Sequence, residues 1–373
     1  MKKWILNILL VIISVVITLT ILELTVRYVY RNVPQNVYEF RKKTIPKSYQ
    51  NSPYFSAEFL KESFSQPGGW TVPPNTRLVI PNDFHGKYFN VTNGIRNTTD
   101  NPKIYKNTVY IFGGSTTYNS EVPDQFTIPS IIQRLINEKY PNKYRVLNYG
   151  ASSVNTYQQL ERLKTISLKK DDIVIFYNGV NDAYLLTTGR PNGWILGENN
   201  IEYEKLSLTR KMLFWVFNKY NSQLKFVFIF FYPYSKNIPE HLTNDVQITK
   251  LQEQLKHNYI LNIRDANALC SRSHVLFYNF LQPIIFTRNP NTAYEKTLLN
   301  NFYIIPPAWR IAGEKSYPVL KICEDDFRSL KIRSYDLSSI FDQREDDFYL
   351  DFCHITDKGN KIIANEIFKR VFH

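Results

Sequence analysis

The sequence predicts an α/β fold: a three-layer α/β/α sandwich with a mostly parallel central sheet of about five strands, preceded by one N-terminal transmembrane helix. Two observations favour this architecture. Short apolar runs rich in β-branched and aromatic residues alternate with segments of helical periodicity between residues 107 and 372. In addition, residues 4–22 form an uncharged apolar stretch that is long enough to span a bilayer.

Five apolar runs are expected to be strands of the central sheet. Strands that are buried on both faces consist of near-continuous apolar runs, whereas half-exposed strands alternate. The runs cover residues 108–112, 144–149, 171–177, 225–232 and 274–279.

Segments with helical spacing of apolar residues lie between and after these runs. They cover residues 128–140, 156–167, 244–269 and 356–372, and the third is long enough for one long or two short helices. Thr356 is suited to cap the last helix. Because strands alternate with helices, we expect a parallel sheet with helices on both faces.

The apolar stretch at the N-terminus favours an uncleaved membrane anchor over a signal peptide. A signal peptide would have a shorter apolar region that ends in small residues, whereas this stretch continues into Glu23-Leu24-Thr25. Its orientation does not follow from charge, because Lys2 and Lys3 before it balance Arg27 and Arg31 after it.

The chain therefore divides into three expected parts. Residues 1–30 form the anchor. Residues 31–105 are rich in proline and asparagine and poor in periodic runs, which is typical of a stalk or cap with little regular structure. Residues 106–373 carry the strand–helix alternation and form the main domain.

The charge balance is strongly basic, with 46 Lys and Arg against 33 Asp and Glu and a net charge of +13. Such a balance is compatible with nucleic acid, an anionic membrane surface or an acidic polymer as a partner. The basic residues are scattered and no nucleic-acid-binding motif is present, so we expect no nucleic-acid partner.

No metal or organic cofactor is expected. The three cysteines, Cys270, Cys323 and Cys353, lack metal-ligand spacing and are interpreted as buried free thiols. A Cys270–Cys323 disulfide is the alternative if the domain is exported. The acidic triplet at 324–326 has no matching ligand set and is interpreted as a solvated face.

Polar residues with catalytic potential follow the predicted strands. Reactive groups gather outside the carboxyl ends of parallel strands. The first three predicted strands are followed by Ser115 within GGS, by Gly150 and by Asn181. Asp351 and His354 stand just before the last predicted helix.

These residue types suit nucleophilic catalysis. A serine hydroxyl needs a base, and His354 can take its proton near neutral pH. Asp351 can bind the other ring nitrogen and stabilise the imidazolium. The backbone N–H groups of Ser115 and Gly150 and the side-chain amide of Asn181 can stabilise a developing oxyanion.

Four stretches together resemble the conserved blocks of the SGNH (GDSL-type) hydrolase superfamily: FGGST at 112–116, NYGAS at 148–152, GVND at 179–182 and DFCH at 351–354. The resemblance implies a catalytic triad of Ser115, His354 and Asp351. It also implies an oxyanion hole formed by Ser115, Gly150 and Asn181. Gly114 replaces the Asp of many relatives, a position that lies outside the triad.

Two further stretches, VTNGIRN at 91–97 and FLQP at 280–283, are similar to the membrane-anchored subgroup of this superfamily. In that subgroup the catalytic domain usually faces away from the cytoplasm, so the resemblance implies an extracytoplasmic domain.

We expect a serine esterase that cleaves O-acyl esters, with acetyl groups on a cell-surface carbohydrate as the favoured substrate. An O-acyltransferase with the same triad and a non-catalytic scaffold or glycan-binding protein of the envelope are the alternatives. The aromatic-rich segment 188–222 is interpreted as helical packing rather than as a sugar platform. Residues 284–345 are expected to form a lid beside the active site.

Overall fold

The computed structural model describes residues 2–29, 45–64, 69–188, 212, 244–301 and 304–372. The chain divides into two compact units, Met1–Thr44 with Glu202–Ile238 and Ile45–Ile201 with Pro239–His373. Predicted strand 225–232 and, except for Thr188 and Met212, the aromatic segment 188–222 lie outside the described residues.

Helix α1 (Lys2–Val29) accounts for nearly all of the described part of the first unit. Its segment Trp4–Val29 has 26 residues and is apolar enough to cross a membrane. At 1.5 Å per residue such a helix is about 39 Å long, against about 30 Å for a hydrocarbon core. The predicted N-terminal apolar helix is therefore confirmed as a helix of spanning length.

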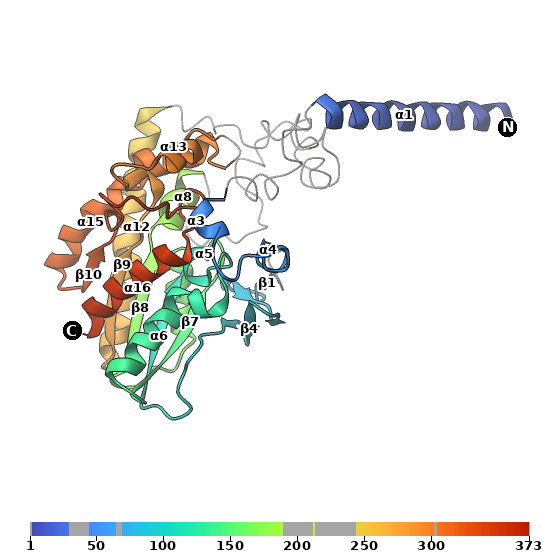
Figure 1. Cartoon of the computed structure of the whole chain (residues 1–373). Helices are drawn as coiled ribbons and strands as arrows, with labels where there is room; N and C mark the ends of the chain where they lie inside the picture. Colours follow the sequence, from blue (N-terminus) through green and yellow to red (C-terminus); the bar gives the residue numbers. More distant parts are fainter. Residues whose placement is uncertain are drawn as a thin grey trace. The chain divides into compact units, whose positions relative to one another are not determined.

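The second unit is built on an eight-stranded sheet in the order β10-β9-β8-β6-β7-β5-β4-β3 (Figure 1). Its first five strands pair in parallel, and the other three extend the β7 edge antiparallel. The parallel strands are β6 (Asn107–Gly113), β7 (Tyr144–Gly150), β8 (Ile173–Asn178), β9 (Leu276–Leu281) and β10 (Ser334–Asp336). The predicted mostly parallel sheet is confirmed.

Four of the predicted strands match within two residues at each end, and the largest offset is that of β9, which begins and ends two residues later than predicted. β10 was not predicted. It has only three residues, with the sequence SYD, and is a strand because it pairs in parallel with Asn279–Leu281 of β9. Such a short polar segment carries no apolar run that a sequence pattern could detect.

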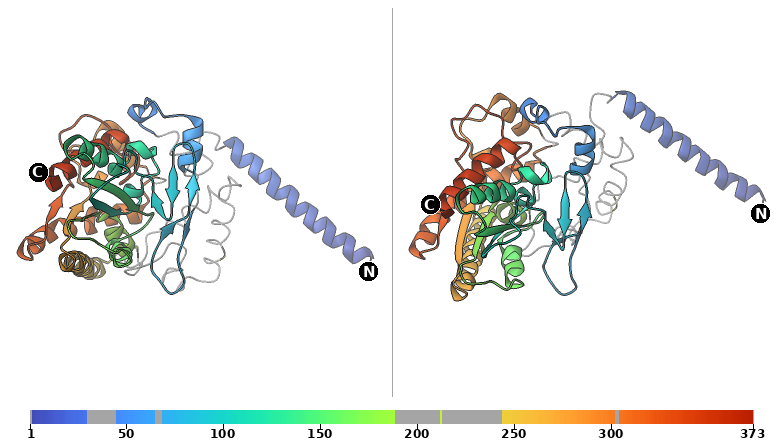
Figure 2. Two further views of the ribbon diagram at one scale, coloured as in Figure 1. Left: turned by 90° about the horizontal axis from the view of Figure 1, so that it is seen from below. Right: turned by 60° about the horizontal axis from the view of Figure 1, so that its bottom comes forward.

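The strand order explains why helices cover both faces. β6 lies between β7 and β8, so the chain moves one way from β6 to β7 and back past β6 to β8. Since parallel crossovers are right-handed, the two connecting helices must lie on opposite faces. Figure 2 shows α6 (Ile128–Lys139) and α16 (Asp357–Phe372) on one face, with α7 (Thr156–Lys164) and α12 (Asp245–Arg272) on the other.

Further helices complete the layer that holds α12. α12 is one long helix, and α7, α8 (Val180–Thr187) and α15 (Pro318–Ser329) pack against it. Between the two helical layers, the aromatic rings of Phe112, Phe176 and Phe277 pack edge to face or tilted across three strands, with centroids 5.2–5.3 Å apart. Stacked layers around one buried sheet make the predicted three-layer sandwich.

Polar side chains begin the helices where the sequence favours them. Thr127 accepts from the N–H of Ser130 at the start of α6, and Asn155 forms a capping box with Gln158 at the start of α7. Thr356 accepts from the N–H of Gly359 at 3.3 Å, as expected for the cap of α16.

The segment predicted as a stalk or cap contains short regular elements in its described part. These are α3 (Lys47–Gln50), α4 (Ala57–Phe64), β1 (Trp70–Thr71), β2 (Ile80–Pro81), β3 (Phe84–His85), β4 (Asn90–Thr92) and β5 (Ile95–Arg96). Tyr49 and Phe59 pack in one apolar cluster with Val122 and Leu350 of the main domain. The predicted boundary at residue 105 stays a prediction, although β3–β5 join the central sheet.

All three cysteines are buried and free. The interpretation as free thiols is confirmed, and the Cys270–Cys323 disulfide is wrong. The acidic triplet is only partly a solvated face: Glu324 is half-buried and accepts from Ser334 at 2.7 Å. Burial raises the pKa of Glu324 to about 7.

Candidate active site

Ser115 is the first residue of the short helix α5 (Ser115–Tyr118), directly after β6 and one glycine. Figure 1 places α5 and α8 at the same edge of the sheet. Gly114 has φ −79°, a value open to any residue, so the turn itself does not require glycine. Glycine is required here by the lack of space, because a Cβ at Gly114 would lie 2.4 Å from Nδ2 of Asn181. The glycine lets the Asn181 amide approach the backbone beside Ser115.

Asp351 organises the loop that precedes α16. One carboxylate oxygen accepts from the backbone N–H groups of Cys353 at 2.9 Å and His354 at 2.8 Å. The other oxygen binds Nδ1 of His354 at 2.7 Å. Because an ionised carboxylate only accepts, Nδ1 carries the hydrogen of the neutral imidazole. The loop thus fixes both the orientation and the tautomer of His354.

The free ring nitrogen of His354 faces Ser115. Nε2 lies 2.8 Å from Oγ of Ser115, although the two residues are 239 positions apart. With the hydrogen on Nδ1, Nε2 accepts the hydroxyl proton of Ser115. The structure therefore brings Ser115, His354 and Asp351 into one continuous hydrogen-bonded chain.

The pKa of His354 is raised well above its usual value of about 6.5. Burial lowers the pKa of this imidazole, but the negative charge of Asp351 raises it, and that of Glu121 adds a smaller contribution. Burial also raises the pKa of the Cys353 thiol to about 11. The thiol is therefore neutral near pH 7, and the carboxylates determine the charge around the ring.

The expected oxyanion donors lie near Ser115, but two of them have protein partners. Nδ2 of Asn181 donates one hydrogen to the carbonyl of Val154 at 2.9 Å, which leaves its second hydrogen for a ligand. The N–H of Gly150 donates to Oδ1 of Asn148 at 2.9 Å. Gly150 can act as an oxyanion donor only by sharing or leaving that bond, a competition that the sequence did not reveal.

A second carboxylate lies beside the Ser115–His354 pair and was missed in the sequence. Oε1 of Glu121 is 3.8 Å from Nε2 of His354, and its side chain is only 6% exposed. Glu121 follows Ser115 by six residues in a loop between α5 and the short helix η1 (Asp124–Phe126). Sequence spacing alone does not indicate in which direction such a loop points.

Aromatic rings also lie near His354. The ring of Phe352 lies 6.4 Å from that of His354, centroid to centroid, and Trp309 packs edge to face on Phe352 at 4.5 Å. Tyr184 of α8 packs on Trp309 at 4.7 Å. Trp309 belongs to α14 (Pro307–Ile311), within the segment expected as a lid, and the lid itself stays a prediction.

The ligand atoms of Asp351, Cys353 and His354 lie within 4.8 Å of one another, close enough to be considered for a metal. In this group, however, Nδ1 of His354 and Oδ2 of Asp351 already bind each other. A thiol with a pKa of about 11 is also a poor ligand, because metals bind the thiolate. The arrangement fits a carboxylate that orients an imidazole better than a metal centre.

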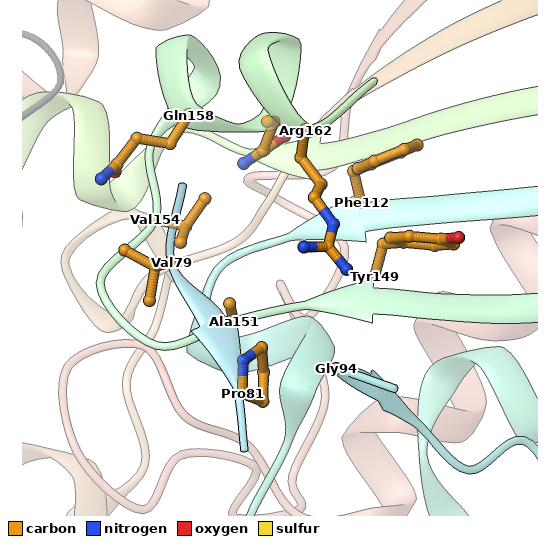
Figure 3. Close-up of a pocket in the computed structure, with 10 residues that line it drawn as sticks. Val79, Pro81, Gly94, Phe112, Tyr149, Ala151, Val154, Gln158 and Arg162 are labelled. Carbon is orange, nitrogen blue, oxygen red and sulfur yellow. The ribbon is translucent and has the colours of Figure 1, made fainter. Parts of the chain in front are cut away.

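A small pocket opens beside the end of β7 (Figure 3). Val79, Ala151 and Val154 form part of its wall, and the guanidinium of Arg162 extends beside the ring of Tyr149, 5.4 Å from the ring centroid. The lining includes none of the three residues of the Ser115–His354–Asp351 chain. This pocket therefore does not contain the candidate site.

No family model and no curated protein matches this chain. Among solved structures, it is similar to a protein described as a lipolytic protein of the G-D-S-L family from Desulfitobacterium hafniense, at 8% identity and a TM-score of 0.38, with 71% of this chain and 100% of that chain covered. The chain is also similar to an acetylxylan esterase from Geobacillus stearothermophilus, at 13% identity and a TM-score of 0.38, with 72% of this chain and 96% of that chain covered. A lipase/acylhydrolase from Enterococcus faecalis is similar at 13% identity and a TM-score of 0.37, with 71% of this chain and 97% of that chain covered. These likenesses are distant, so the function has to be argued from the geometry of the site.

Proposed function

We propose that this chain is a serine esterase that cleaves O-acyl esters through an acyl-enzyme on Ser115. The observation that carries the proposal is the hydrogen-bonded chain from Ser115 Oγ to His354 Nε2 at 2.8 Å and from His354 Nδ1 to Asp351 at 2.7 Å. Nucleophile, base and orienting carboxylate in this order are the arrangement that activates a serine hydroxyl.

The reaction follows from these positions. Ser115 Oγ attacks the acyl carbonyl while its proton moves to His354 Nε2, and the carbonyl electron pair moves to the oxygen. The second hydrogen of Asn181 Nδ2 and the N–H of Ser115 can stabilise that oxyanion. His354 then protonates the departing alkoxide. A water molecule loses its proton to His354 and attacks the acyl-enzyme. The bond between the acyl carbon and Ser115 Oγ then breaks, Oγ takes the proton back from His354, and the carboxylic acid leaves.

The substrate part of the proposal is an acetyl ester on a cell-surface carbohydrate. Helix α1, which is long and apolar enough for an anchor, supports a location at a membrane. The resemblance of residues 91–97 and 280–283 to the membrane-anchored subgroup supports an extracytoplasmic catalytic domain. We expect no metal, organic cofactor or nucleic acid to take part.

Labelling with a fluorophosphonate probe tests the nucleophile. The full chain in detergent should be labelled at one serine, and Ser115→Ala should abolish the label. Ser152→Ala is the matched control, because Ser152 follows the neighbouring strand β7 and is expected to leave labelling intact. An unlabelled wild type, or equal labelling of Ser115→Ala, would refute the proposal.

Product analysis then separates hydrolysis from transfer. Incubation with an aryl acetate should release acetate at the rate at which the phenol appears. If an added oligosaccharide becomes acetylated while acetate release slows, the same residues perform acyl transfer and the hydrolase assignment is wrong.

A further inference from the structure

The buried carboxylate of Glu121 is not used in the mechanism above. It lies in the loop that directly follows α5, with Oε1 3.8 Å from Nε2 of His354, the nitrogen that exchanges protons with Ser115. Asp351 binds the opposite nitrogen of the same ring. The imidazole is therefore flanked by two carboxylates, one at each nitrogen.

The backbone around Glu121 is held by distant residues. The hydroxyl of Tyr49 donates to the carbonyl of Glu121 itself. The guanidinium of Arg96 binds the backbone carbonyl of Val122 at 2.7 Å and also those of residues 118 and 119. These bonds fix the loop on both sides of Glu121, so its carboxylate is placed at His354 by the fold.

The carboxylate has few polar partners. Oε1 accepts from the hydroxyl of Ser120 at 3.3 Å, and Oε2 is buried with no hydrogen-bond partner among the described residues. A buried anion is costly unless a cation or several donors compensate it. Within the described part of the chain, the imidazolium of His354 is the cation that can form in direct contact with it.

Other charged or titratable groups face Glu121 from the neighbouring elements. Arg96 carries a positive charge nearby, but its guanidinium forms an ion pair with Asp124 at 3.1 Å. Burial raises the pKa of Tyr49, and burial raises that of Cys353, so both are neutral near pH 7. The charge of Asp351 acts on the other side of the ring.

We infer that Glu121 is a second electrostatic partner of His354, which stabilises the imidazolium from the Nε2 side and sets the pH range in which His354 works as a base. The inference rests on the proposed function of Ser115 and His354. Glu121 takes no proton in this scheme, and the proton still passes between Ser115 Oγ and His354 Nε2.

The physical reason lies in the two protonation states of the ring. In the neutral ring, the Nε2 lone pair and the Glu121 carboxylate are both electron-rich and repel each other. Once Nε2 takes the proton from Ser115, the repulsion becomes attraction between opposite charges. Glu121 thus favours the state formed as the serine attacks, and it also keeps His354 protonated to higher pH.

The test is the pH dependence of fluorophosphonate labelling of the full chain, compared between wild type and Glu121→Gln. An opposite charge within about 4–6 Å shifts a pKa by about 1–3 units. We therefore expect Glu121→Gln to move the acid limb of the labelling rate about one unit or more toward lower pH. The rate at the alkaline plateau should fall roughly three- to ten-fold, since a weaker base accelerates less.

Two controls make the result specific. Glu138→Gln removes an exposed carboxylate of α6 in the same chemical way and should leave the limb unchanged. Glu121→Asp keeps the charge one methylene farther from the ring, so its limb should lie between those of the wild type and the glutamine variant. If Glu121→Gln does not fold, the pH dependence of labelling of Glu121→Asp is compared with that of the wild type instead.

The possible outcomes separate the two proposals. If the wild type is not labelled at any pH, the proposed function fails. If it is labelled and a folded Glu121 variant lowers the plateau without moving the limb, Glu121 has only a structural role and this inference is overturned. An unchanged rate and limb in the folded variant would overturn it as well.

Discussion

The proposed chemistry depends on the imidazole of His354, which has a carboxylate at each ring nitrogen. Asp351 accepts three hydrogen bonds from a single loop, two from backbone N–H groups and one from Nδ1. This arrangement requires the carboxylate to be ionised and Nδ1 to be protonated. The tautomer of His354 is thus determined by Asp351.

Replacing Asp351 by asparagine should abolish this control of the tautomer. The amide can present its N–H to Nδ1, which would move the ring hydrogen to Nε2. A protonated Nε2 cannot accept the proton of Ser115. We expect a loss of about 10⁴-fold in turnover of an aryl acetate, by analogy with the same change in other serine triads. Turnover within ten-fold of the wild type would show that Asp351 does not orient the base.

The pH dependence of the wild type follows from the raised pKa of His354. The ring is a base only when neutral, so a pKa above the usual value of about 6.5 places the acid limb of kcat/KM above that pH. Aryl acetate hydrolysis measured from pH 5 to 9 checks the acid limb of kcat/KM. An acid limb below pH 6.5 would contradict the expected charge environment of His354.

The raised pKa of His354 also affects the free energy of unfolding. By linkage, this group stabilises the fold below a pH of about 6.5, and the stabilisation is lost as the pH rises through the pKa of His354 in the folded chain.

The short helix α5 and strand β7 pack with no space for a side chain between them. A Cβ on Gly150 would lie 2.2 Å from the backbone nitrogen of Tyr118 and 2.7 Å from the backbone carbon of Thr117. Both contacts are with backbone atoms of α5, so the helix that begins with Ser115 would have to move.

Gly150→Ala should therefore displace Ser115, the proposed nucleophile. A misplacement of about 1 Å can cost about 10²-fold in rate, and we expect a loss of at least that order in fluorophosphonate labelling. Circular dichroism should still report a folded α/β protein. Labelling at the wild-type rate would show that α5 and β7 tolerate the added methyl group.

The loop between α5 and η1 depends on one buried ion pair. Arg96 is fully buried, pairs with Asp124 at 3.1 Å, and lies 4.0 Å from the centre of the Phe89 ring. It also binds the backbone carbonyl of the last residue of α5 and two backbone carbonyls of the loop. This arginine belongs to the stretch 91–97, and its contacts give that stretch a structural role.

Arg96→Met should destabilise the fold by about 3–5 kcal/mol, because it leaves the carboxylate of Asp124 buried without its cation. The exposed pair of Arg134 and Asp100, 3.4 Å apart, provides the control, and Arg134→Met should cost about 1 kcal/mol or less. Guanidinium unfolding of both variants measures the difference. Equal effects would mean that the buried pair contributes no more than a surface pair.

The whole chain combines an apolar helix with a folded unit that contains every residue of the candidate site. Ser115, Asn181, Asp351 and His354 all belong to the unit formed by Ile45–Ile201 and Pro239–His373. Helix α1 belongs to the other unit. Membrane attachment and catalysis are therefore expected to be separable.

A chain that starts at Ile45 should lose membrane attachment and keep fluorophosphonate labelling. The full chain should remain in the pellet after alkaline extraction of membranes, whereas the shortened chain should be in the supernatant. Labelling of the shortened chain should still depend on Ser115. If the full chain is extracted by alkali, α1 is not a membrane anchor.

Patterns among neighbouring residues were sufficient to predict much of this protein. The apolar runs located β6, β7, β8 and β9, and helical spacing located α6, α7, α12 and α16. The N-terminal apolar helix α1 followed from its length and composition. All candidate residues follow predicted strands or precede the last predicted helix. Because parallel strands end at one edge of a sheet, residues at these positions are expected to lie close together.

Other features depend on contacts between residues far apart in the sequence. The pairing of β10 with β9 and the bond between Gly150 and Asn148 have no local pattern that indicates them. The position of Glu121 beside His354 depends on Tyr49, 72 positions earlier, and on Arg96. Periodicity and strand ends are encoded by adjacent residues, so the sequence predicts the elements and the candidate nucleophile. The charge around His354 arises from long-range packing and was visible only in the folded chain.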